Sequence, residues 1–117
     1  MIKTNIPASG SKFNQQGLVI MKLTQVEKRF ENLALIRGGV FLLSPADAMQ
    51  FVNTCKEQGI AILGVEGFKV FGETIQPFQE HSLDFAGVIE DSHEATVRFL
   101  QDRKDTGLWF EIVTDDR

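Results

Sequence analysis

The sequence predicts a single α+β domain in which about three helices pack on a mixed sheet of four to five strands. Apolar residues follow helical spacing in some segments and strand spacing in others, and no linker or internal repeat divides the chain. A length of 117 residues fits one domain. Hydrophobic residues make up 43% and charged residues 24%, which excludes a disordered or low-complexity chain.

The start of the sequence differs from the rest. Residues 1–20 are polar and rich in turn-forming residues, and only Phe13 and the run Leu18–Ile20 offer apolar side chains for packing. We therefore expect residues 1–20 to be a leader or extension, and residues 21–117 to form the domain. Met21 is an alternative natural start.

A first helix is expected from Leu23 to Leu35, because apolar residues recur there at helical spacing. Thr24 can cap its start, with Glu27 three residues later as the second member of a capping box. Gly38 and Gly39 then end the helical pattern.

A strand and a second helix are expected next. Val40–Leu43 is a short apolar run typical of a buried strand. Ser44 is a good N-cap, and Pro45 suits the first position of a helix. This helix should continue to about Gln58, because Gly59 is a typical left-handed stop.

A hairpin is expected after the second helix. Its strands would be Ile60–Val65 and Phe68–Phe71, with Glu66-Gly67 as the turn. The following stretch, Glu73–Gly87, is the least regular part of the chain, and Pro77 in its middle argues against a central strand.

The last third of the chain completes the predicted sheet. Ser82–Ala86 is expected to form a short strand, and Ser92 to cap a third helix over about His93–Lys104. The strongest strand pattern runs from Leu108 to Val113. Within it Leu108, Phe110 and Ile112 share one face, and the residues between them share the other.

Charge is distributed unevenly. Residues 66–94 hold seven acidic residues and one lysine, whereas bases outnumber acids in residues 1–65; the net charge of the chain is −4. Such a chain is a poor binder of phosphate backbones, so no direct nucleic-acid contact is expected. The apolar runs are too short to span a bilayer and no secretory signal is recognisable, so we expect no membrane contact and a cytoplasmic location.

No group of residues has the pattern of a catalytic centre. Cys55, the single cysteine, falls on the apolar face of the second predicted helix and is expected in the core. His93 with Glu90, Asp91 and Glu94 is the densest potential metal cluster, but only His81 could supply a second imidazole. The favoured interpretation is an acidic helix N-terminus, so we expect no catalytic residues, no metal, no cofactor and no enzymatic activity.

The acidic segment is also rich in phenylalanine, and its short elements cannot bury all of these rings. Exposed aromatic side chains surrounded by acids are typical of a protein-binding surface. The side chains expected to contact a partner are Glu66, Glu73, Glu80, Asp84, Glu90 and Asp91, with Phe71 and Phe78 as apolar anchors.

Five segments together carry a resemblance: Ser44–Ala48, Leu63–Phe68, Pro77, Ser82–Phe85 and Trp109–Val113. With them, residues 22–115 resemble small immunity proteins of bacterial toxin systems, including those of contact-dependent growth inhibition. The resemblance implies a cytoplasmic protein that binds one cognate toxin domain, often a nuclease, and blocks it. An acidic surface would be electrostatically suited to a basic nuclease site.

Three functions are therefore weighed. The leading hypothesis is an inhibitor that binds a basic toxin domain. A second is a small metal- or ligand-binding domain or enzyme that uses His93, Glu90 and Glu94, with His81 nearby. A third is a structural or regulatory subunit whose phenylalanine-rich surface forms a homodimer. The oligomeric state is left open by the sequence.

Overall fold

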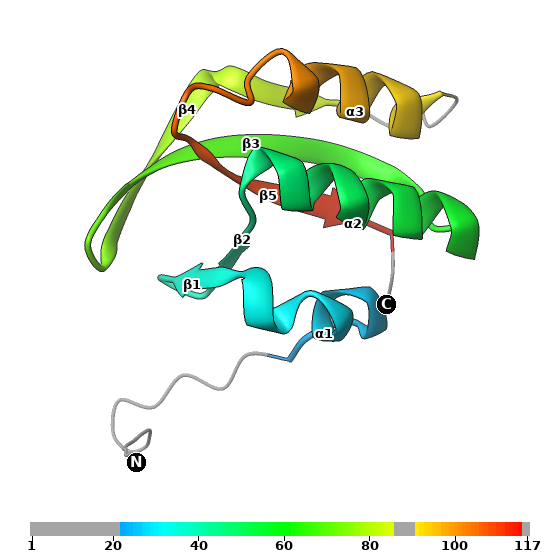
Figure 1. Cartoon of the computed structure of the whole chain (residues 1–117), viewed down its shortest axis with the longest axis horizontal. Helices are drawn as coiled ribbons and strands as arrows, with labels where there is room; N and C mark the ends of the chain where they lie inside the picture. Colours follow the sequence, from blue (N-terminus) through cyan, green and yellow to red (C-terminus); the bar gives the residue numbers. More distant parts are fainter. Residues whose placement is uncertain (1–21, 86–90, 116–117) are drawn as a thin grey trace.

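The computed structural model describes residues 22–85 and 91–115 (Figure 1). The α+β class is confirmed. In chain order its elements are α1 (Gln25–Arg29), the 3-10 turn η1 (Glu31–Leu33), β1 (Leu35–Arg37), β2 (Val40–Leu42), α2 (Pro45–Gln58), β3 (Ile62–Phe71), β4 (Thr74–Asp84), α3 (Ser92–Gln101) and β5 (Trp109–Thr114). The predicted leader, residues 1–20, and the alternative start at Met21 lie outside the described residues.

The described strands form two antiparallel sheets, whereas the sequence predicted one mixed sheet. One sheet has the order β4-β3-β5, and the other is the β1–β2 hairpin. Leu43 joins them: its N–H donates to the carbonyl of Phe110 at 2.9 Å and its carbonyl accepts the N–H of Phe110 at 2.8 Å. The small sheet is thereby fixed to the outer edge of β5.

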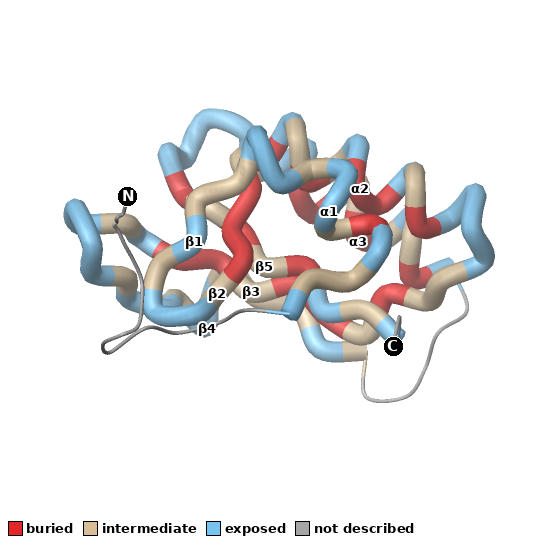
Figure 2. The backbone as a smooth tube through the Cα atoms, turned by 90° about the horizontal axis from the view of Figure 1, so that it is seen from below, coloured by how far each residue is buried: buried red, intermediate tan, exposed pale blue. Residues whose placement is uncertain are grey.

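Helices α2 and α3 lie side by side against one face of the β4-β3-β5 sheet (Figure 1). The core forms between these two helices and the sheet. Its buried residues are Val26, Phe41, Leu43, Ala48, Phe51, Val52, Cys55, Ile62, Val65, Phe99, Leu100, Leu108, Phe110 and Ile112. Figure 2 shows buried residues in red on α2, α3, β2, β3 and β5.

Several local predictions are confirmed. The Thr24 hydroxyl accepts the N–H of Glu27 at 3.1 Å, and the Glu27 carboxylate accepts the N–H of Thr24 at 2.9 Å, which is a complete capping box. Ser44 caps α2, and Gly59 ends it with φ 72°. Cys55 is fully buried in the core.

The first helix is shorter than predicted. It ends at Arg29, and Leu35 belongs to β1 instead. Gly38 and Gly39 have left-handed φ values of 58° and 77°, which form a tight hairpin turn between β1 and β2. The glycines that were expected to end the first helix therefore lie beyond it, and they turn one strand onto the next.

The predicted hairpin around Glu66-Gly67 is wrong. β3 continues through both residues, and the turn falls at Gly72, which has φ 61°. Most of the following stretch forms the long strand β4, which includes the expected strand from Ser82 as far as Asp84 and is interrupted by one bulge. Pro77 is tolerated there because β4 lies at the edge of its sheet, where one side of the backbone needs no hydrogen-bond partner within the sheet.

The third helix begins differently from the prediction. Asp91, with φ 60°, is the N-cap, and Ser92 is the first helical residue. The Ser92 side chain is fully buried, and its hydroxyl has no hydrogen-bond partner among residues 22–85 and 91–115. The helix ends at Gln101, three residues before the expected end.

Candidate functional site

An open, acidic surface lies on the face of the β4-β3-β5 sheet turned away from α2 and α3. Val65 and its neighbour in register, Ile112, point into the core. Because side chains alternate along a strand, Glu66 and the Glu111 opposite it point to the other face. Ser82 of β4 is the other register neighbour of Glu66 and completes this row across the sheet.

The next row of the same face forms a hollow. Gly64 pairs with Asp84 on one side and with Val113 on the other. The hollow has a volume of about 580 Å³. Its lining residues are Leu63, Gly64, Val65, Glu66, Gln79, Ser82, Leu83, Asp84 and Val113. Val113 is 42% exposed, so the surface combines carboxylates with an accessible apolar side chain.

The open surface around Glu66 and Glu111 is called the acidic face below, and these two carboxylates repel each other. The pKa of Glu111 is raised above its ordinary value of 4.5, first by burial, then by the negative charge of Glu66 and that of Glu27 on α1. Among residues 22–85 and 91–115, no lysine or arginine forms an ion pair with Glu66 or Glu111. In the described part of the chain, Glu66 and Glu111 are therefore held close together without a compensating base.

Removing the Glu111 charge is expected to stabilise the fold at neutral pH. A raised pKa means that stability is fully present below the ordinary pKa and is lost as pH rises through the folded-state pKa. Glu111→Gln should increase the free energy of unfolding by roughly 0.2–1 kcal/mol at pH 7, the usual cost of a directly opposed like-charge pair. The gain should vanish near pH 3, well below the ordinary pKa, where the carboxyl is protonated in both states.

Urea denaturation at both pH values measures this gain. The control is Glu57→Gln, which removes an exposed carboxylate at the end of α2, away from this row. A loss of stability in Glu111→Gln at pH 7, or an equal effect at both pH values, would contradict the electrostatic account.

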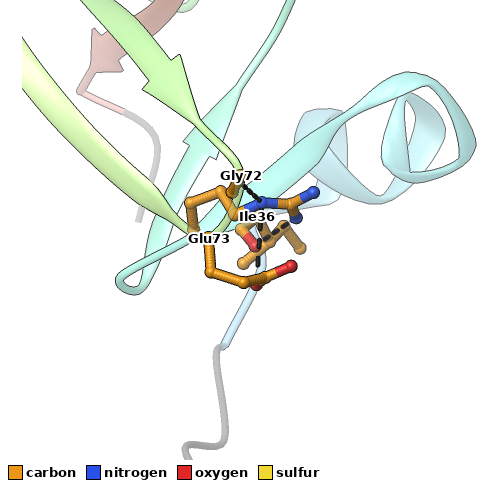
Figure 3. A network of polar contacts seen from close by, with 4 residues as sticks. Ile36, Gly72 and Glu73 are labelled. Carbon is orange, nitrogen blue, oxygen red and sulfur yellow. Dashed lines mark hydrogen bonds and ion pairs between the residues drawn. The ribbon is translucent and has the colours of Figure 1, made fainter.

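Glu73 and Phe71 lie at the far end of the β3–β4 hairpin, away from the hollow. Arg37 of β1 reaches this turn: its Nε donates to the Gly72 carbonyl at 3.0 Å and lies 3.7 Å from a Glu73 carboxylate oxygen (Figure 3). Its Nη1 also donates to the carbonyl of Ile36. Phe71 is 51% exposed and so offers an accessible aromatic ring.

Glu80 and Phe78 lie at an irregularity of β4. The register passes from Phe78, opposite Gly67, to Ser82, opposite Glu66, so that Gln79, Glu80 and His81 bulge out of the ladder. Glu80 is exposed, whereas Phe78 is half-buried and packs against the core. The Ser82 hydroxyl closes the bulge by donating to the Phe78 carbonyl at 3.0 Å.

His81 and Arg103 hold this bulge against α3. The Arg103 guanidinium lies 3.7 Å from the centre of the Phe99 ring. Its Nε donates to His81 Nδ1 at 3.1 Å, and its Nη1 donates to the Phe99 carbonyl. Because a guanidinium only donates, His81 Nδ1 must carry no proton in this arrangement.

The remaining predicted contact residues lie elsewhere. Asp91 is exposed at the start of α3, and Glu90 lies outside the described residues. The structure thus brings Glu66 and Asp84 together, leaves Glu80 at the neighbouring bulge, and places Glu73 and Phe71 at the opposite end of the hairpin.

A second depression runs between α2 and α3 and has a volume of about 380 Å³. Its lining residues are Asn53, Lys56, His93, Glu94, Val97, Arg98 and Gln101. His93 Nε2 lies 2.6 Å from the carbonyl of Ile60, so it donates there and is held by the backbone. Within the described residues, no three His, Cys, Asp or Glu side chains are grouped to hold a metal ion.

Sequence reasoning missed Glu111 and Glu27 as members of the acidic face. Glu111 could have been found from strand parity, since it alternates with the buried Phe110 and Ile112. No sequence signal placed Glu27 near it, because that proximity depends on how α1 packs.

No helix in the described ranges 22–85 and 91–115 is long and apolar enough to cross a membrane. Neither the profiles of known protein families nor the sequences of curated proteins gave a match to this chain.

Proposed function

We propose that this protein is a non-enzymatic inhibitor, an immunity protein of a bacterial toxin system, that acts in the cytoplasm by binding a basic toxin domain. One observation supports this above the others: Glu66 and Glu111 lie directly opposite each other on an open sheet face, and the pKa of Glu111 is raised. When a cation approaches two carboxylates held this close together, it relieves their repulsion and so lowers the free energy of the surface.

The chemistry of the partner follows from the site. A lysine or arginine side chain placed between Glu66 and Glu111 would replace their repulsion by two attractive contacts. Nuclease domains present such cations because they bind phosphate backbones. The inhibitor would then occupy the basic residues that the nucleic acid needs.

The shape of the surface fits a protein partner. A stable interface buries about 800 Å² on each side, with apolar groups near its centre and a polar rim. Val113, with 42% of its surface exposed, lies beside the carboxylates of the hollow and supplies an apolar contact. Phe71 lies five residues along β3 from Glu66, so by strand alternation its ring points to the other side of the sheet and is not part of this contact surface.

The test is binding to the toxin domain encoded beside the gene for this protein. The double variant Glu66→Gln/Glu111→Gln should bind at least about tenfold more weakly, which corresponds to about 1.4 kcal/mol. Its affinity should also depend less on salt than that of the unmodified protein. Isothermal titration calorimetry at two salt concentrations measures both effects.

The control for this experiment is Glu57→Gln, which removes one exposed acid from the end of α2 and should leave affinity unchanged. Equal affinity and equal salt dependence of the double variant and the unmodified protein would show that the acidic face is not the binding surface. A neighbouring toxin domain that is not bound at all would refute the proposed function.

A small-ligand site is the second candidate, and the depression between α2 and α3 is the observation that favours it. Lys56 and Arg98 on its walls suit a small anion, with Asn53 and Gln101 as hydrogen-bond donors. Chemical shifts of the amides of α2 and α3 that saturate on addition of inorganic phosphate would support this site.

A further inference from the structure

The depression between α2 and α3 collects positive charge. Lys56 on α2 and Arg98 on α3 line it from the two helices, which lie side by side (Figure 1). Among residues 22–85 and 91–115, neither of these cations forms an ion pair. Glu94 is the only acid in the lining, so two cations face one carboxylate. In a chain whose net charge is −4, this is a local site for an anion.

The depression is larger than an oxyanion alone requires. Its volume of about 380 Å³ falls within the usual range of small-molecule sites, about 300–1,000 Å³. Val97, half-buried on α3, adds an apolar side chain to the lining. Asn53 and Gln101 add amide groups that can donate to oxygen atoms. Cations, amides and one apolar side chain together suit an anionic group that carries a small organic part.

His93 also lines the depression, and the backbone fixes where its ring carries a proton. Nε2 donates to the Ile60 carbonyl across 2.6 Å. The neutral ring therefore has no proton on Nδ1, which can then only accept a hydrogen bond. Protonation of Nδ1 adds both a second N–H donor and a positive charge. Histidine side chains change charge in this way between about pH 5 and pH 8.

The other charged groups on the elements packed against α3 lie outside this lining. They are Asp47 and Glu57 on α2, Glu66 and Lys69 on β3, and His81 on β4. Asp91, the N-cap of α3, is also not part of the lining. The charged groups that share the depression with His93 are therefore Lys56, Arg98 and Glu94.

We infer that the depression binds the dianionic phosphate group of a small organic phosphate ester between Lys56 and Arg98, and that His93 takes up a proton from solvent as the anion binds. The proton goes to Nδ1, and the resulting N–H donates to a phosphate oxygen. Affinity for a dianion therefore rises as pH falls through the range in which histidine titrates. This inference rests on the second candidate function and is independent of toxin binding.

Sulfate is the probe for proton uptake, because its double charge does not change between about pH 5.5 and pH 8, whereas that of a phosphate ester does. Amide shifts of the full chain, followed at constant ionic strength, should give a sulfate affinity about fivefold higher at the lower pH. His93→Gln keeps a donor for the Ile60 carbonyl and should show no such pH dependence. Equal affinity at both pH values in the unmodified protein, or an unchanged pH dependence in His93→Gln, would overturn the proton uptake.

Charge variants test the position of the anion. Lys56→Gln/Arg98→Gln should weaken sulfate binding about tenfold, whereas Lys104→Gln, at an exposed position beyond α3, should leave it unchanged. Glu94→Gln should bind sulfate about threefold more tightly, a gain that a misfolded variant would not show. Failure of sulfate and inorganic phosphate to give saturable shifts at either pH would refute the second candidate function. Saturable binding without pH dependence would refute the role of His93 alone.

The organic part of the ligand has its own test. At about pH 8, phenyl phosphate should bind about threefold more tightly than inorganic phosphate, because its ring can pack against Val97. Val97→Ala should remove most of this difference. Equal affinities of the two phosphates for the unmodified protein would overturn the assignment of an organic ester.

Discussion

Gly67→Ala is expected to destabilise the domain by roughly 1–3 kcal/mol, the usual cost of forcing a methyl group into a packed site. A Cβ at this position would lie 2.7 Å from the carbonyl oxygen of His81 and 3.0 Å from both its Cβ and an edge carbon of Phe110. Relief requires a shift of the β4 backbone or of a fully buried ring. Denaturant unfolding monitored by Trp109 fluorescence measures the loss.

The same substitution should disturb the acidic face. The bulge that crosses over Gly67 carries Gln79, and Ser82 follows it; both line the hollow. Lys69→Ala, at an exposed position of the same strand, is the control and should change stability by no more than about 0.5 kcal/mol. A Gly67→Ala variant as stable as this control would show that β4 does not approach β3 as closely as described.

Phe110→Ala should cost about 3–5 kcal/mol, the largest effect expected in this protein, because it leaves a cavity in the centre of the core. The Phe110 ring is fully buried and stacks edge-on against Phe99, with ring centres 6.2 Å apart. Its backbone also exchanges two hydrogen bonds with Leu43, so the site lies where the two sheets join.

Phe71→Ala is the matched comparison for Phe110→Ala, since the same ring is removed where it is 51% exposed. Its effect on stability should be within about 0.5 kcal/mol. Thermal unfolding by calorimetry distinguishes the two variants. Similar melting temperatures for both would mean that Phe110 is not part of the core.

Local signals predicted those parts of the fold that depend on local chemistry. Helix α2 was predicted at both ends because Ser44, Pro45 and Gly59 each act through the backbone next to them. In the last strand, Leu108, Phe110 and Ile112 were expected to share a face, and all three are buried.

Pairing between distant strands could not be predicted in the same way. A glycine inside an apolar run indicates either a turn or the close approach of another backbone. At Gly67 another backbone approaches closely, and only the position of β4 shows this. The same limit applies to predicting the acidic face from the sequence. Glu66 and Asp84 were expected to contact a partner, but the row that joins Glu66 to Glu111 depends on the register of β3 with β5.

The irregularity of β4 has a consequence for how other proteins can approach the sheet. Pro77 supplies no N–H, and Gln79, Glu80 and His81 fall out of the ladder, so the outer edge of this strand presents a broken row of backbone groups. Such an edge is a poor template for strand addition by another polypeptide, which protects the folded domain from edge-to-edge aggregation. A partner of the kind proposed would then have to contact side chains on the open face rather than the backbone of this edge.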